Sequence, residues 1–99
     1  MKRYTISQAN QATVAAEAIQ VNPDGSFSGA AIVQLSKCED FLALISQERQ
    51  AVIAEMDRLR ERNQTKSVRF RELFISKLVY ANLAAQLAHC GLTDDSMEP

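Results

Sequence analysis

Hydrophobic and polar positions follow two different periods along this chain of 99 residues. In the N-terminal third, apolar side chains alternate with polar ones on both sides of the turn signal Asn22-Pro23-Asp24-Gly25. Asn and Pro favour the first two positions of a type I turn, and Gly tolerates the positive φ that closes it. The pattern therefore predicts a β-hairpin within residues 16–33, with one apolar face made of Ile19, Val21, Phe27, Ala31 and Val33.

The residues before this turn allow a second interpretation. Residues 9–18 are rich in Ala, which is the strongest helix former and a weak strand residue. A short helix within residues 7–19 is the alternative to a strand in this segment.

The rest of the chain has a helical period. Residues 34–90 contain no Gly and no Pro and consist mostly of strong helix formers. Ser36 and Glu39 have the spacing of a capping box, which predicts a helix that begins near Ser36. Apolar side chains recur in alternating steps of three and four, with Arg49 as the one charged member, and predict a heptad seam of Leu35, Cys38, Leu42, Ile45, Val52, Met56 and Leu59.

Five consecutive polar residues, 63–67, divide the helical region. Asn63 suits the left-handed position that ends a helix, and Thr65 or Ser67 can cap the next one, which predicts a turn between two antiparallel helices. The alternative is one continuous helix in a dimeric coiled coil, because the heptad phase continues through Phe70, Leu73, Tyr80, Ala84 and Leu87.

The composition of the second helix favours the hairpin. Its residues 78–88 are apolar on nearly all sides, and only Asn82 and Gln86 form a narrow polar stripe. A two-stranded seam cannot cover so wide an apolar surface. We therefore also expect a homo-oligomer, most simply a dimer that buries the apolar excess of this helix. Gly91 stands where a left-handed residue ends a helix.

These patterns together predict a mainly α member of the α+β class. A short N-terminal β-hairpin packs on a long antiparallel two-helix hairpin, with helices over about 36–62 and 66–90. We expect one domain, 1–99, made of the hairpin segment 1–33, the helical hairpin 34–91 and a flexible acidic tail, 92–99.

The composition also indicates the cellular compartment in which we expect the protein. No apolar run has the length of a signal peptide or of a membrane span, so we expect a soluble protein without membrane contact. Two cysteines are too few for a disulfide framework, which is typical of reduced thiols in a cytoplasmic protein. A formal net charge of -1 gives no overall attraction to nucleic acid.

The two cysteines form another candidate site. If the turn is centred on Gln64, Cys38 lies opposite Cys90, with His89 beside it. Neighbouring residues on a helix point about 100° apart, so these three side chains make a poor zinc site. We expect two small buried thiols instead, and neither a metal nor a cofactor.

The clearest candidate site is a cationic cluster around the predicted turn. A hairpin would gather its members at one tip, where they could bind an acidic protein surface or nucleic-acid phosphates. Acidic residues before the cluster and the lack of interleaved aromatic residues other than Phe70 favour a protein partner. The candidate residues are Arg58, Arg60, Arg62, Lys66, Arg69 and Arg71.

The other residue types and motifs of the sequence argue against catalysis. The chain has one His and lacks a Gly-rich phosphate loop, a metalloprotease motif and a nucleophile elbow. We therefore expect a small non-catalytic interaction protein, an adaptor or an inhibitor that binds a larger protein, as accessory products of mobile elements or phages do. The alternative is a nucleic-acid-binding protein that uses the arginine-rich tip.

Overall fold

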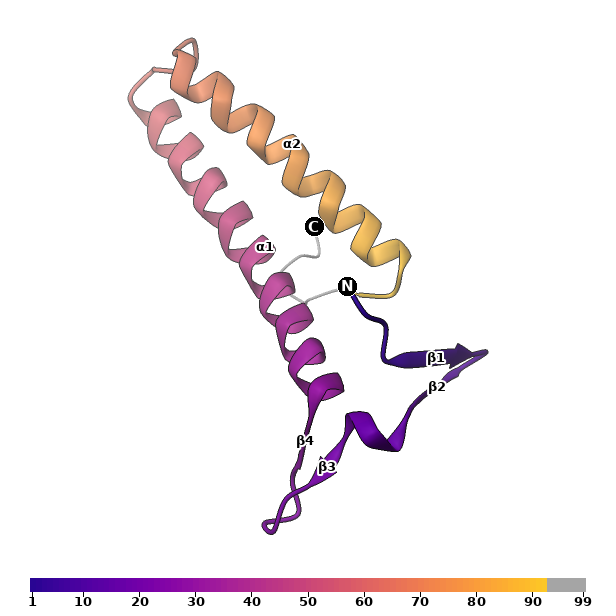
Figure 1. Cartoon of the computed structure of the whole chain (residues 1–99). Coiled ribbons are helices and arrows are strands. Elements are labelled where there is room, and N and C mark those ends of the chain that lie inside the picture. Colours follow the sequence, from indigo (N-terminus) through magenta and orange to yellow (C-terminus); the bar gives the residue numbers. More distant parts are fainter. Residues whose placement is uncertain (93–99) are drawn as a thin grey trace. The chain divides into compact units, whose positions relative to one another are not determined.

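The structure, a computed structural model, describes residues 1–92 (Figure 1). A short antiparallel β-hairpin precedes two long helices that pack together, which confirms the predicted, mainly helical α+β class. The chain falls into two compact units, of which the first is Met1–Asp40 and the second begins at Phe41. The predicted acidic tail lies outside the described residues from Thr93 on.

The hairpin predicted from Asn22-Pro23-Asp24-Gly25 is present but short. Strand β3 (Gln20–Val21) pairs with β4 (Phe27–Ser28), and the amide of Gly25, at φ +88°, donates to the Asn22 carbonyl over 3.0 Å. The expected apolar face is wrong, because Val21 is 71% and Phe27 is 58% exposed. Ala31 and Val33 do not belong to a strand at all, since the first helix has already begun there.

A second hairpin precedes this one. Strand β1 (Thr5–Gln8) pairs with β2 (Gln11–Val14) around a two-residue turn in which Ala9 has φ 50°. The helical alternative for residues 7–19 is therefore wrong up to Val14, and only a single 3-10 turn, η1 (Ala16–Ala18), follows. Strand pairing overrides the helix propensity of the alanines, because propensity is a weak preference beside backbone pairing.

Helix α1 (Ala30–Glu61) begins six residues before the predicted start. Gly29 precedes it with φ +123°, and a Cβ at this position would lie 2.4 Å from the Ala18 carbonyl oxygen, so only Gly fits between η1 and the helix. From Ala30 on no residue breaks the helix. Ser36 and Glu39 consequently lie in the helix interior, and the predicted capping box does not form.

The predicted turn between the helices is confirmed. Helix α2 spans Val68–His89, and α1 ends where Asn63 adopts φ 56°. The amide of Gln64 donates to the Leu59 carbonyl over 2.8 Å and that of Asn63 to the Arg60 carbonyl over 3.0 Å, the bond pattern of a Schellman motif. The chain therefore reverses here, and the continuous coiled coil is wrong.

Side-chain capping begins the second helix and a left-handed Gly ends it. Ser67 Oγ accepts from the Phe70 amide over 3.1 Å and donates to the Gln64 carbonyl over 2.8 Å. Gly91 has φ +81°, and the Leu92 amide donates to the Leu87 carbonyl over 2.8 Å. Ser67 and Gly91 thus have the predicted roles, whereas Thr65 caps nothing.

The core between the helices follows the predicted seam over only part of its length. Val52 and Met56 of α1 pack with Leu73 of α2 and bury all three side chains, and Leu59, Phe70 and Tyr80 pack against this cluster. Leu35 and Cys38, the first two seam positions, are exposed. Helix α2 has 22 residues against 32 in α1, so it can cover only part of the longer helix.

We expect Leu73→Ala to lower the free energy of unfolding by about 2–5 kcal/mol, because Leu73 is 4% exposed and the smaller side chain leaves a cavity. Leu44→Ala is the matched control, since Leu44 is 50% exposed and its truncation should cost under about 1 kcal/mol. Urea denaturation followed by circular dichroism measures both. Equal losses in the two variants would contradict the packing described here.

The two serines provide a second matched pair. Ser67→Ala removes the α2 cap and should cost about 1 kcal/mol of unfolding free energy. Ser36→Ala should be neutral or slightly stabilising, because Ser36 is an exposed position inside α1, where Ala is the better helix former. Should Ser36→Ala prove the costlier change in urea denaturation, α1 would begin at Ser36 after all.

Candidate functional site

The six cations predicted as a site lie on both sides of the helical turn, and all are exposed. Arg58 and Arg60 belong to the last turns of α1, Arg62 and Lys66 to the connection, and Arg69 and Arg71 to the first turn of α2. The turn therefore gathers them at one end of the helical hairpin, as the sequence predicts. They are not equivalent, however, because carboxylates of the same helices engage some of them.

Arg69 is the most strongly engaged of the six. Its Nε donates to Glu55 Oε1 and its Nη2 to Glu55 Oε2, each over 3.0 Å, so the two helices are linked by a bidentate pair. A second carboxylate, Glu72, lies 3.7 Å from Arg69 Nη1. The hydrogen bonds from Arg69 hold the pKa of Glu55 below its usual value, and those to Glu55 raise the pKa of Arg69.

Arg60 is engaged as well. Its Nη1 donates to Asp57 Oδ1 over 2.8 Å, and its guanidinium carbon lies 5.4 Å from the centre of the Phe70 ring, within cation–π range. Arg58 forms no salt bridge with any residue of 1–92, but its charge contributes to the lowered pKa of Glu55. Arg60 and Arg69 thus stabilise the hairpin locally and are poor candidates for binding a partner.

Besides Arg58, whose charge acts on Glu55, three cations of the set remain available at the turn. Within residues 1–92, Arg62, Lys66 and Arg71 have exposed side chains that form no salt bridge. Lys66 and Arg71 also line a recess of about 180 Å³ whose other walls are Thr65, Ser67, Phe70 and Phe74. A recess with two cations at its rim and two phenyl rings in its wall suits a carboxylate carried beside an apolar group.

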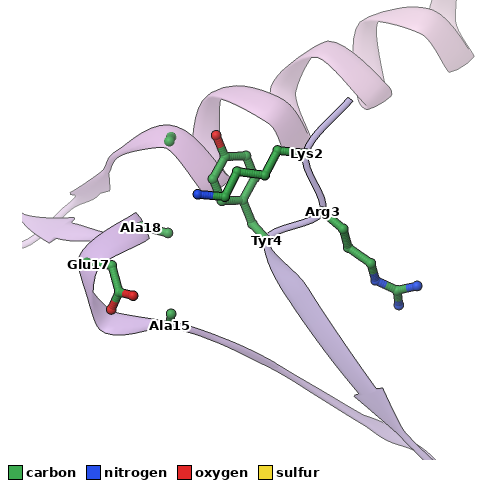
Figure 2. A pocket seen from close by; sticks show the side chains of 7 residues that line it. Lys2, Arg3, Tyr4, Ala15, Glu17 and Ala18 are labelled. Atoms are coloured by element: carbon green, nitrogen blue, oxygen red, sulfur yellow. The ribbon is translucent and has the colours of Figure 1, made fainter.

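The N-terminal unit contains a second recess, which no pattern in the sequence predicts. It encloses about 270 Å³ (Figure 2), and its charged and aromatic walls are Lys2, Arg3, Tyr4 and Glu17. Lys2 Nζ lies 5.3 Å from the centre of the Tyr4 ring, and Figure 2 shows these two side chains together while Arg3 points away from them. No sequence signal marks this site, because it depends on where β1 and η1 meet the start of α1.

The cysteines do not form a site. Cys38 and Cys90 are both exposed, so the expected pair of buried thiols is wrong, and neither is part of a disulfide. In the part of the chain that the structure describes, no three His, Cys, Asp or Glu side chains come together as metal ligands. Among residues 1–92, no helix combines the length and apolar character that crossing a bilayer requires.

Comparison with known proteins adds no assignment. No protein-family model matches the sequence, and no curated protein or solved structure is significantly similar to it. The functional argument therefore rests on the residues themselves.

The Glu55–Arg69 pair generates a pH-dependent prediction. These hydrogen bonds need an ionised carboxylate, so they stabilise the fold above the pKa that Glu55 has in the unfolded chain and are lost as the pH falls through its lowered pKa in the folded one. We expect Arg69→Gln to raise the Glu55 pKa to its ordinary value in a carboxyl NMR titration. Its stability deficit should shrink as the pH falls below about 4.3, the ordinary pKa of Glu, and should be gone once the pH lies below the lowered pKa of Glu55 in the folded chain.

Arg60→Gln is the control for this titration, since it removes an ion pair with Asp57 and leaves the bonds to Glu55 intact. The Glu55 pKa should not move in this variant. An unchanged Glu55 pKa in Arg69→Gln would mean that the pair between the helices does not form in solution.

Proposed function

We propose that this chain is a non-catalytic protein-interaction module that binds an acidic surface of a larger protein through the turn between α1 and α2. The observation that carries the proposal is the set of three exposed cations, Arg62, Lys66 and Arg71, which form no salt bridge within residues 1–92. Arginine and lysine on a rigid helical turn bind carboxylates with little loss of backbone freedom. Such a module acts as an adaptor or as an inhibitor.

The neighbourhood of these cations supports a protein partner over nucleic acid. Phe70 and Phe74 share the recess with Lys66 and Arg71, so a partner can place an apolar group beside its carboxylate. Of the six cations, Arg60 and Arg69 are paired with carboxylates of the chain itself. Glu72 lies beside the site and would repel a phosphate backbone.

The proposal is tested with two variants of equal charge. Lys66→Glu with Arg71→Glu reverses two cations of the turn, and Arg3→Glu with Lys37→Glu reverses one Arg and one Lys of the N-terminal unit. Each pair changes the formal net charge from -1 to -5, since each reversal subtracts two. Only the first pair should weaken binding to the partner, by about tenfold or more in Kd at low salt.

The partner is first identified by affinity capture from the native cell with the wild-type chain as bait, and binding is then measured with purified components. Affinity for the partner should fall as salt is added, because exposed charges are screened. Equal affinities of the two charge variants for the captured protein would overturn the proposal. Salt-sensitive binding of labelled duplex or single strands that only the turn variant loses would replace it with the nucleic-acid alternative.

A further inference from the structure

The side of α2 that faces away from its contact with α1 is apolar and exposed. Phe74, Ile75, Leu78 and Val79 expose 47, 57, 56 and 53% of their surface. At about 100° per residue, these four side chains fall within an arc of about 140° on the side of the helix opposite Leu73, which packs against α1. We call these four residues the outer face of α2.

Between Phe74 and Gln86, over about three turns of helix, the stripe of α2 that contains the outer face carries no charge, and Arg71 bounds it at its N-terminal end. It continues beyond Val79 with Asn82, Ala85 and Gln86, which are also exposed. Large side chains thus occupy its N-terminal half, and small or polar ones its C-terminal half. A partner with charges at these positions would have to desolvate them without compensation, so the stripe suits an uncharged helix of the same kind.

The core of the helical unit by itself is small. Between Phe41 and Leu92, the buried hydrophobic side chains are Ile45, Val52, Met56 and Leu73. Half-exposed side chains of the outer face leave roughly 300–400 Å² of apolar surface per chain in water, against the roughly 500 Å² of apolar area per partner in an interface of standard size. The outer face therefore supplies most of the apolar area that a stable dimer needs.

We propose that the outer face binds a second copy of this chain, with the two α2 helices antiparallel about a two-fold axis near Leu78 and Val79. The midpoint of Val68–His89 falls between these two residues. In this arrangement Leu78 lies level with Val79 of the partner subunit, and the large half of each stripe lies on the small half of the other. A parallel pair would place large on large and small on small, which packs poorly.

The cations at the turn also favour the antiparallel orientation of the two α2 helices. Arg62, Lys66 and Arg71 mark one end of α2, and a parallel pair would bring the two sets of cations together. In the antiparallel pair the two turns are separated by roughly the length of the helix, about 33 Å, which is several times the Debye length at physiological salt. Arg62 and Lys66 lie outside α2 and its outer face, whereas Phe74 belongs both to this face and to the recess beside Lys66 and Arg71.

Sedimentation equilibrium of the full-length chain tests the dimer. We expect twice the monomer mass of 11.0 kDa for the wild type. Leu78→Glu should weaken the dimer about a hundredfold or more, because the axis places two carboxylates together in the interface. Leu44→Glu is the matched control, since Leu44 of α1 is similarly exposed, at 50%, and lies outside the outer face. It should leave the dimer unchanged.

The orientation is tested with the native Cys90, which is exposed at the end of α2. In a Cys38→Ser background, a spin label on Cys90 reports the distance between the two copies by pulsed electron resonance. The antiparallel pair predicts about 35 Å between the labelled backbones, whereas a parallel pair would bring them to about 10 Å.

Several outcomes would overturn the dimer. The first is a wild-type chain that remains monomeric up to about 0.1 mM. The second is a Leu78→Glu variant that still dimerises and has the helix content of the wild type. The third is a short distance between the two Cys90 labels. If Leu78→Glu loses helix content, Val79→Lys provides the second variant, with the same expected loss of the dimer. Failure of the dimer can be distinguished from failure of the proposed function, because partner binding by the turn is measured separately with the charge variants.

Discussion

The packing of Val52 and Met56 on Leu73 is the contact on which the helical unit depends. It joins residues 17 or more positions apart in the chain, and it forms only because the backbone reverses between Arg62 and Ser67. The reversal itself is local: a left-handed Asn63 satisfies the last carbonyls of α1, and the Ser67 hydroxyl satisfies an amide of α2. Local hydrogen bonding and distant packing thus select the same conformation.

In this hairpin one side of α2 is buried against α1 and the opposite side is exposed. The buried side contains Leu73 and parts of Phe70 and Tyr80, and the opposite side leaves the outer face in water. The cations at the turn are likewise divided. Arg60 and Arg69 are held by carboxylates of the chain, whereas in the described part of the chain Arg58, Arg62, Lys66 and Arg71 form no salt bridge. The proposed partner site at the turn and the proposed dimer interface on α2 adjoin each other at Phe74, which belongs to both.

The candidate site could be located from the sequence, but its members could not be ranked. Six basic residues within 14 positions predict a cationic tip whenever the chain reverses near Gln64. Which cations are neutralised depends on contacts across the turn, such as the one between Arg69 and Glu55, 14 residues apart. No spacing rule for a single helix identifies that pair. The recess at Tyr4 in the N-terminal unit could not be predicted from the sequence either, because three separate segments of the chain form it.

Four features could be predicted from local sequence, because each depends on backbone preferences of neighbouring residues. They are the helical period, the turn at 63–67, the cap at Ser67 and the hairpin turn at Asn22–Gly25. Contacts between remote segments instead set where α1 begins, where the seam stops being buried and that both cysteines are exposed. The start of α1 depends on the close approach of Gly29 to Ala18, and burial depends on which surfaces a shorter partner helix can reach. These are distances between residues remote in the chain, which no local pattern encodes.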